Sequence, residues 1–175
     1  ILTNKFGMNQ TWSGVIMALD NLFALFLLPL FGALSDKTNT KFGRRTPYIF
    51  VGTICAVLFF IFLPLIDTLW LFILVLLLVL LSMSIFRSPA VALMPDVTCK
   101  PYRSKANAVI NLMGTAGGMI VLVFGTIFKT SEEHKTDFFP YILATAGLML
   151  LGLIVFLLTV REKKWAAEAD KINSK

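Results

Sequence analysis

Apolar residues occur along this chain in five long runs, separated by short polar connections. The runs predict helices over residues 12–34, 47–66, 69–94, 106–128 and 138–160. Each run holds the roughly 20 helical residues that are needed to cross a hydrocarbon core of about 30 Å. The runs lack the alternation of apolar and polar positions that is typical of a membrane barrel. The pattern therefore predicts an all-α, polytopic bundle of five transmembrane helices.

Charge refines this picture. The chain is 57% hydrophobic and 15% charged, outside the usual range of soluble domains, but its net charge of +6 would also suit a nucleic-acid partner. The placement of the cations decides for a lipid bilayer and against nucleic acid. They gather in alternate connections and after the fifth run, at Lys37, Lys41, Arg44, Arg45, Lys100, Arg103, Lys105, Arg161, Lys163, Lys164, Lys171 and Lys175. By the positive-inside rule these segments are cytoplasmic, which places Ile1 outside the cell membrane and Lys175 in the cytoplasm.

The first cytoplasmic connection carries a distinctive motif. From Gly32 to Pro47 it reads GALSDKTNTKFGRRTP, with Asp36 at the end of one helix and Gly43, Arg44 and Arg45 before the next. A solvated basic loop accounts for the lysines of this segment but not for the acid. An acid at a helix end can accept hydrogen bonds from a neighbouring helix N-terminus or pair with an arginine.

A second motif follows in the third run. Residues 87–96 read RSPAVALMPD, and residues 103–114 read RSKANAVINLMG. Asp96 falls at the same inner level as Asp36 and Arg45. We therefore predict a cytoplasmic polar network in which Asp36 and Asp96 share the guanidinium of Arg45, and which would break if these helix ends moved apart. The residues expected to form this conformational switch, called the switch motif, are Gly32, Asp36, Gly43, Arg44, Arg45 and Asp96.

Together these motifs resemble the major facilitator superfamily, and most closely its sucrose/proton symporters and glycoside-pentoside-hexuronide cation symporters. The resemblance implies a 12-helix fold in which this chain supplies helices 2–6: residues 1–160 form part of the amino-terminal half, and residues 161–175 begin a cytoplasmic linker. A first helix before Ile1 and a carboxy-terminal half of the same polypeptide are expected. The implied activity is symport of a disaccharide-like sugar with protons by alternating access. No enzyme activity, cofactor or metal site is expected.

Four polar residues within the runs are candidates for binding the sugar or the proton. An ionisable side chain costs about 2.5 to 3.5 kcal/mol at the centre of a membrane helix, so Arg87 and Asp20 each call for a reason. Arg87 lies roughly 13 Å along its helix from Asp96, at about 1.5 Å per residue. Asn107 and Asn111 share a helix face and can bind sugar hydroxyls or join helices.

This chain departs from the pattern of these symporters in two places. The arginine that sucrose/proton symporters place directly before Ala-Leu is Val91 here, so its role passes to Arg87, four residues earlier on the same helix face. In the melibiose-type branch, cation-holding acids would fall near Ala24 and Leu28, and neither is acidic here. This favours protons over sodium, although a sodium-coupled glycoside symporter and a non-transporting scaffold fragment stay open.

Overall fold

A computed structural model of the chain describes residues 9–129 and 139–173. The described residues form six α-helices and two short 3-10 helices, joined by short connections, and contain no strand. Their bounds are α2 Gln10–Lys37, α3 Thr46–Phe62, η1 Leu63–Leu65, α4 Leu69–Val97, η2 Lys100–Tyr102, α5 Arg103–Lys129, α6 Phe139–Thr159 and α7 Glu162–Asn173. Residues 1–8, before the first predicted helix, and residues 130–137, between the fourth and fifth, lie outside the described residues.

Four stretches of the described chain are long and apolar enough to cross a membrane: Thr46–Leu65, Leu69–Val97, Lys100–Ile127 and Phe139–Thr159. They match four of the five predicted spans, with ends that differ from the predicted bounds by at most six residues. The first predicted span lies within α2, which has 28 residues. That α2 is helical agrees with the sequence pattern, and its crossing of the membrane stays a prediction.

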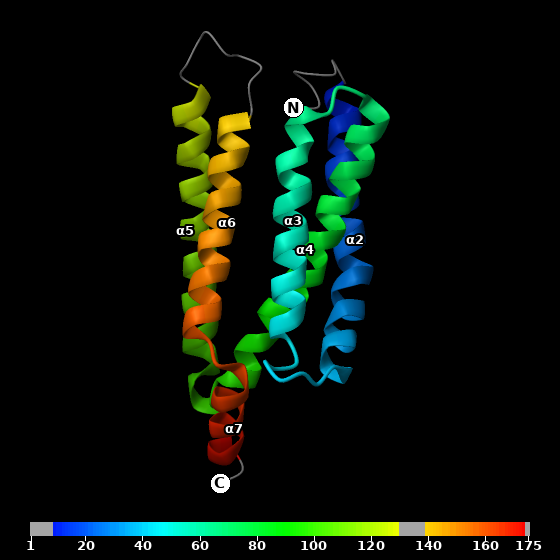
Figure 1. Ribbon diagram of the computed structural model, residues 1–175. Helices are drawn as coiled ribbons and strands as arrows, with labels where there is room; N and C mark the ends of the chain where they lie inside the picture. Colours follow the sequence, from blue (N-terminus) through cyan, green and yellow to red (C-terminus); the bar gives the residue numbers. More distant parts are fainter. Residues whose placement is uncertain (1–8, 130–138, 174–175) are drawn as a thin grey trace.

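The long helices run roughly alongside one another (Figure 1). Helix α4 packs against both α2 and α3, α3 also contacts α6, and α5 packs on α6. Helix α7 follows α6, extends beyond the end of the bundle (Figure 1) and contacts α4. The end of the bundle that carries the α2–α3 connection therefore also carries α7, and we call it the inner end.

Close helix contacts are made where small residues occur. A Cβ added to Gly52 of α3 would lie 2.8 Å from the backbone nitrogen of Phe86 in α4, so these backbones approach as only glycine permits. On the other side of α4, the Ser88 hydroxyl donates to the Leu28 carbonyl oxygen of α2 over 2.6 Å. A polar bond in an otherwise apolar contact fixes how α2 and α4 are aligned.

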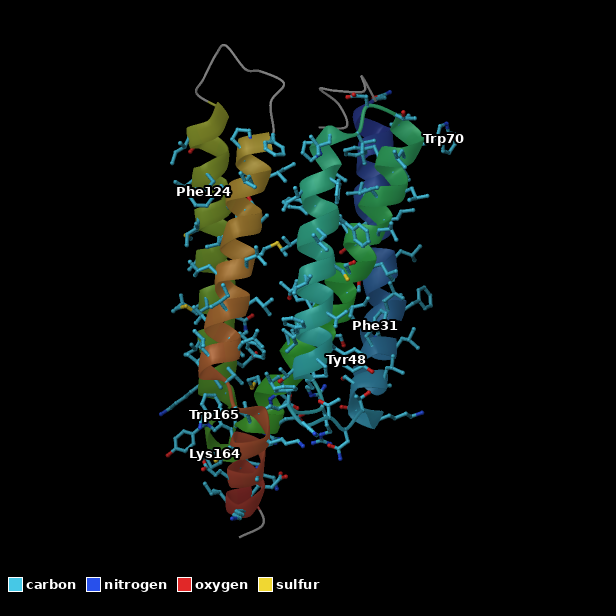
Figure 2. The ribbon with its side chains drawn as sticks, in the orientation of Figure 1. Phe31, Tyr48, Trp70, Phe124, Lys164 and Trp165 are labelled. Atoms are coloured by element: carbon cyan, nitrogen blue, oxygen red, sulfur yellow. The ribbon has the colours of Figure 1, made fainter. Side chains whose placement is uncertain are left out.

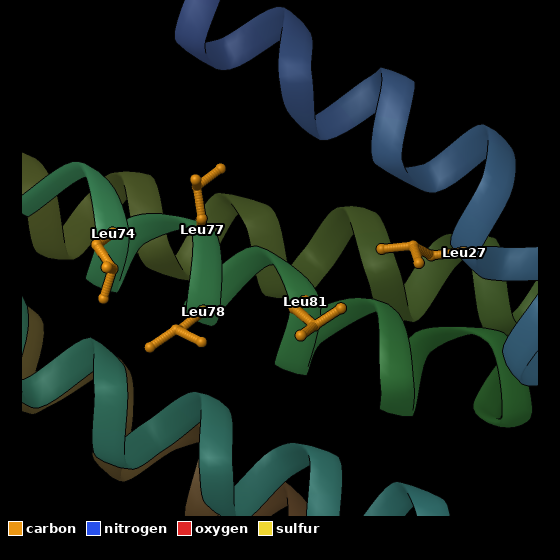
Figure 3. Close-up of a pocket in the computed structure, with 5 residues that line it drawn as sticks. All are labelled: Leu27, Leu74, Leu77, Leu78 and Leu81. Atoms are coloured by element: carbon orange, nitrogen blue, oxygen red, sulfur yellow. The ribbon is translucent and has the colours of Figure 1, made fainter.

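Large apolar side chains remain exposed on the outside of the helices, as expected for surfaces that face lipid. Trp70 is 82% exposed at the end of the bundle opposite Lys164 and Trp165 (Figure 2). Aromatic side chains at two opposite levels are typical of the two membrane interfaces. One apolar hollow of about 290 Å³ lies along α4, lined by Leu27, Leu74, Leu77, Leu78 and Leu81 (Figure 3). Because these leucines offer no polar side-chain group to hydroxyls, this hollow is not a candidate sugar site.

Candidate functional site

The connection between α2 and α3 is a compact turn held by its own backbone. The N–H of Thr40 donates to the carbonyl oxygen of Gly43, and the N–H of Gly43 donates back to Thr40, over 3.2 and 3.3 Å. Gly43 has φ +139°, a conformation that L side chains rarely adopt. The hydroxyl groups of Thr38 and Tyr48 lie 2.7 Å apart and tie the start of the turn to α3. The turn thereby fixes the orientation of the Arg45 backbone at the start of α3.

Arg45 lies between two acids on two different helices. Its Nη2 is 2.8 Å from Asp36 of α2, and its Nε is 2.6 Å from Asp96 of α4. A third contact, of 3.4 Å, joins Nη1 to the hydroxyl of Ser35. The Arg45 side chain is only 8% exposed, whereas Asp36 is 57% and Asp96 26% exposed. We call Asp36, Arg45 and Asp96 the Arg45 network, and its contacts are those predicted from the sequence.

Sequence reasoning missed the residue that binds the backbone on which Arg45 lies. Glu162, the first residue of α7, is 4% exposed and accepts hydrogen bonds from the backbone N–H groups of Arg44, Arg45 and Thr46 over 2.7, 3.1 and 2.9 Å. The Thr46 hydroxyl adds a fourth bond of 2.7 Å. The Glu162 carboxylate therefore caps α3, and it also occupies the first turn of its own helix, where a negative charge is favoured.

The electrostatics of Glu162 follow from these contacts. Burial raises the pKa of a carboxyl group, but the hydrogen bonds from Thr46, Arg45 and Arg44 outweigh that effect and lower the pKa of Glu162 below its ordinary value of 4.5. Glu162 is therefore ionised at neutral pH.

Gly43 makes room for this carboxylate. A Cβ added to Gly43 would overlap Oε2 and Cδ of Glu162. The glycine of the Gly-Arg-Arg sequence is thus required twice, once by its φ angle and once by the approach of Glu162.

Two further bonds anchor the inner ends of α4 and α7. The Arg103 guanidinium donates to the carbonyl oxygen of Pro95 over 2.9 Å, which satisfies a backbone acceptor in the last turn of α4. The backbone N–H of Lys100 donates to the side-chain oxygen of Asn173 over 2.8 Å. Helix α7 is therefore tied to the bundle at both of its ends.

The other residues singled out in the switch motif have structural roles. A Cβ on Gly32 would lie 3.1 Å from the Ser88 hydroxyl, so this glycine lies at the contact of α2 with α4. The Arg44 side chain is exposed, and only its backbone N–H reaches Glu162.

Among the described candidate substrate residues, only Asn107 and Asn111 are joined by hydrogen bonds. Arg87 is exposed on α4, on the same face as the 62% exposed Val91, and makes no hydrogen bond or ion pair with the described residues. Asn111 donates to the carbonyl oxygen of Asn107, one turn earlier on α5, over 3.0 Å, and both side chains are exposed. Asp20 lies in α2, and its side chain is outside the described part of the chain.

Comparison with known proteins agrees with this geometry. Residues 2–175 match the family described as MFS/sugar transport protein. Over 50 residues the chain is 38% identical to the sucrose transport protein SUC4 of Arabidopsis thaliana, a segment that is 29% of this chain and 10% of that protein. No solved structure matches the chain. The family match covers nearly every residue and confirms the predicted resemblance, so this chain belongs to the MFS/sugar transport protein family of multi-pass membrane transporters.

Proposed function

We propose that this chain is part of a secondary transporter that moves a disaccharide-like sugar together with protons. The observation that carries the proposal is the family match over residues 2–175, joined to a polar network at the inner helix ends where that family's signature motif falls. The similarity to a sucrose transport protein favours a disaccharide among sugars. We call the polypeptide that contains this chain and a second, carboxy-terminal half the complete transporter.

The Arg45 network supplies the closing contact of the proposed cycle. Alternating access requires a set of contacts that exists in one state and breaks in the other. Asp36, Arg45 and Asp96 belong to three different segments, α2, the start of α3 and α4, so relative movement of these helices separates them. In the proposed orientation, Ile1 is outside the cell membrane and the network lies on the cytoplasmic side, where it favours the outward-open state.

Arg87 is the proposed contact with the sugar or with a proton-carrying carboxylate. An exposed guanidinium within a membrane span of 29 residues is costly unless it faces a polar or water-filled path. Its planar set of donors suits neighbouring hydroxyls or a carboxylate. Asn107 and Asn111 present amide groups on the exposed face of α5, and with Asp20 they complete the candidate set.

The test is uptake of radiolabelled sucrose by proteoliposomes that contain the complete transporter. We expect accumulation driven by an imposed proton gradient and abolished by a protonophore, with little response to sodium. Accumulation that is driven by a sodium gradient alone would show that the transporter is a sodium-coupled glycoside symporter instead. If no disaccharide, monosaccharide or glycoside is taken up under either gradient, the sugar assignment is wrong.

The chain alone is a matched control, because alternating access requires two halves around one site. Reconstituted by itself, it should take up no more sugar than empty liposomes. Saturable uptake by the chain alone would contradict the two-half mechanism.

A further inference from the structure

The contacts of Glu162 concern three consecutive backbone positions at the start of α3. Arg45 is the N-cap residue and makes no capping bond with its own side chain. The first N–H groups of a helix have no carbonyl partner four residues earlier within the helix. Here Tyr48 and Ile49 both donate to the carbonyl oxygen of Arg45, over 3.1 and 3.2 Å, so the N–H groups of Arg45 and Thr46 need another acceptor. Glu162 accepts from Arg45 and Thr46, while Pro47 has no N–H to satisfy. One carboxylate, 116 residues away from Thr46 in sequence, thus completes the end of this helix.

The same contacts fix where the Arg45 side chain begins. The backbone of Arg45 is held directly, and those of its neighbours Arg44 and Thr46 are held on either side, all by Glu162. An arginine side chain has about 2 kcal/mol of rotamer entropy, so a fixed starting point lowers the cost of reaching two acids at once. From this point the guanidinium reaches Asp36 and Asp96 at 2.8 and 2.6 Å.

Helix α7 carries Glu162 and moves with it. The helix follows α6 directly, packs on α4, and is fastened at its far end by the bond between Asn173 and the backbone of Lys100. A displacement of α7 away from α4 would withdraw the carboxylate from α3. The Arg45 backbone would then lose the contacts that hold it in place.

We infer that Glu162 is a positioning residue for the Arg45 network, and that docking of α7 is thereby coupled to closure of the inner end. This inference rests on the proposed function, because it deepens the role given there to Asp36, Arg45 and Asp96. Undocking of α7 weakens the network, and docking of α7 strengthens it. The segment that follows the sixth helix is thus an active part of the switch and not only a tether.

The first test measures amide hydrogen exchange at residues 44–46 in the protein reconstituted in lipid nanodiscs. Loss of charge-assisted bonds in Glu162→Gln should speed exchange of these amides by about ten- to a hundred-fold. Glu162→Asp keeps the charge on a side chain one methylene shorter and should restore part of the protection. The control Glu168→Gln makes the same charge change at an exposed position of α7 and should leave these amides unchanged. Equal exchange in the wild type and Glu162→Gln would overturn the inference.

The second test separates positioning from general stabilisation. In the complete transporter, we expect Asp36→Asn to increase labelling of an inner-end cysteine several-fold in the wild-type background but less than about two-fold when Glu162→Gln is already present. Glu162→Asp should restore part of the response to Asp36→Asn. Fully independent effects of the two substitutions would show that Glu162 stabilises α3 without placing Arg45, and would refute the inference.

Neither readout uses sugar, so the two proposals fail separately. If the wild-type transporter takes up no sugar, the proposed function is wrong, while the exchange and labelling results still decide the role of Glu162.

Discussion

Substitution of Gly43 by alanine tests the geometry of the inner end most directly. The new Cβ meets two obstacles. The alanine must adopt φ +139°, which L residues rarely do, and its Cβ overlaps the Glu162 carboxyl group. Either the turn changes its backbone conformation or Glu162 leaves the end of α3. In both cases the α3 cap is lost or distorted.

The size of the effect follows from the two costs. A side chain held in an unfavourable backbone region costs about 1–3 kcal/mol. Loss of a helix cap costs about 0.5–2 kcal/mol, and the bonds here involve a charged acceptor. We therefore expect Gly43→Ala to destabilise the fold by about 2–4 kcal/mol. In a chain of this length, each kcal/mol of destabilisation lowers the melting temperature by about 2–4 °C. The melting temperature of Gly43→Ala should therefore be roughly 5–15 °C below that of the wild type.

The two cysteines provide the assay. Cys55 in α3 and Cys99 beside η2 are free and partly buried, so a thiol-reactive fluorescent dye reports their exposure as detergent-solubilised protein is heated. Gly114→Ala is the matched control, because a Cβ there meets no described atom within 4 Å. This control should melt at or slightly above the wild-type temperature, since alanine favours a helix by about 0.5–1 kcal/mol over glycine. If Gly43→Ala melts within 1 °C of the wild type, the Glu162 cap does not exist as described.

Much of the fold was predictable because lipid imposes a simple rule on sequence. A run of about 20 apolar residues has few structural options in a bilayer, and helix ends fall where charges begin. The contacts of Arg45 were predictable for a related reason. Each residue of the Arg45 network lies at the inner end of a helix: Asp36 and Asp96 in the last turns of α2 and α4, and Arg45 at the start of α3. A buried guanidinium at that level requires acids as partners.

The role of Glu162 was not predictable from the same rules. In sequence it is one acid among Arg161, Lys163 and Lys164, in a segment identified only as a charged, helix-permissive linker. One signal was present. Helix α3 begins without a self-capping Ser, Thr, Asp or Asn at Arg45, so a partner from another segment was needed. Which segment supplies it depends on where α7 packs against α4, and local sequence does not encode that.

The face of Arg87 was equally beyond sequence reasoning. Spacing gives depth along a helix, and it places Arg87 and Val91 on one face, but it does not say what that face meets. The structure shows the face exposed among the described residues. Its function therefore stays a prediction that only substitution can test.

Three further predictions extend the test to transport and pH. In the complete transporter, Asp36→Asn should shift cysteine accessibility toward the inward-open state and reduce uptake, because Arg45 loses one of its two acids; an unchanged accessibility pattern would remove the switch role. Both Arg87→Ala and Arg87→Lys should reach the membrane yet lose most proton-driven sugar accumulation, since lysine lacks the planar donor set. Normal transport by Arg87→Lys would instead favour a simple topological charge. The last prediction concerns acid, and its sign follows from the lowered pKa of Glu162. A group whose pKa is lower in the folded state contributes stability that is fully present above its unfolded value, here about 4.5, and that is lost as pH falls through the folded value. The melting temperature of the wild type should therefore fall toward that of Glu162→Gln as pH is lowered from 6 to about 3. All other acidic side chains are the same in both proteins, so the difference between the two curves isolates Glu162. A difference that stays constant with pH would show that the Glu162 charge contributes nothing to holding the end of α3.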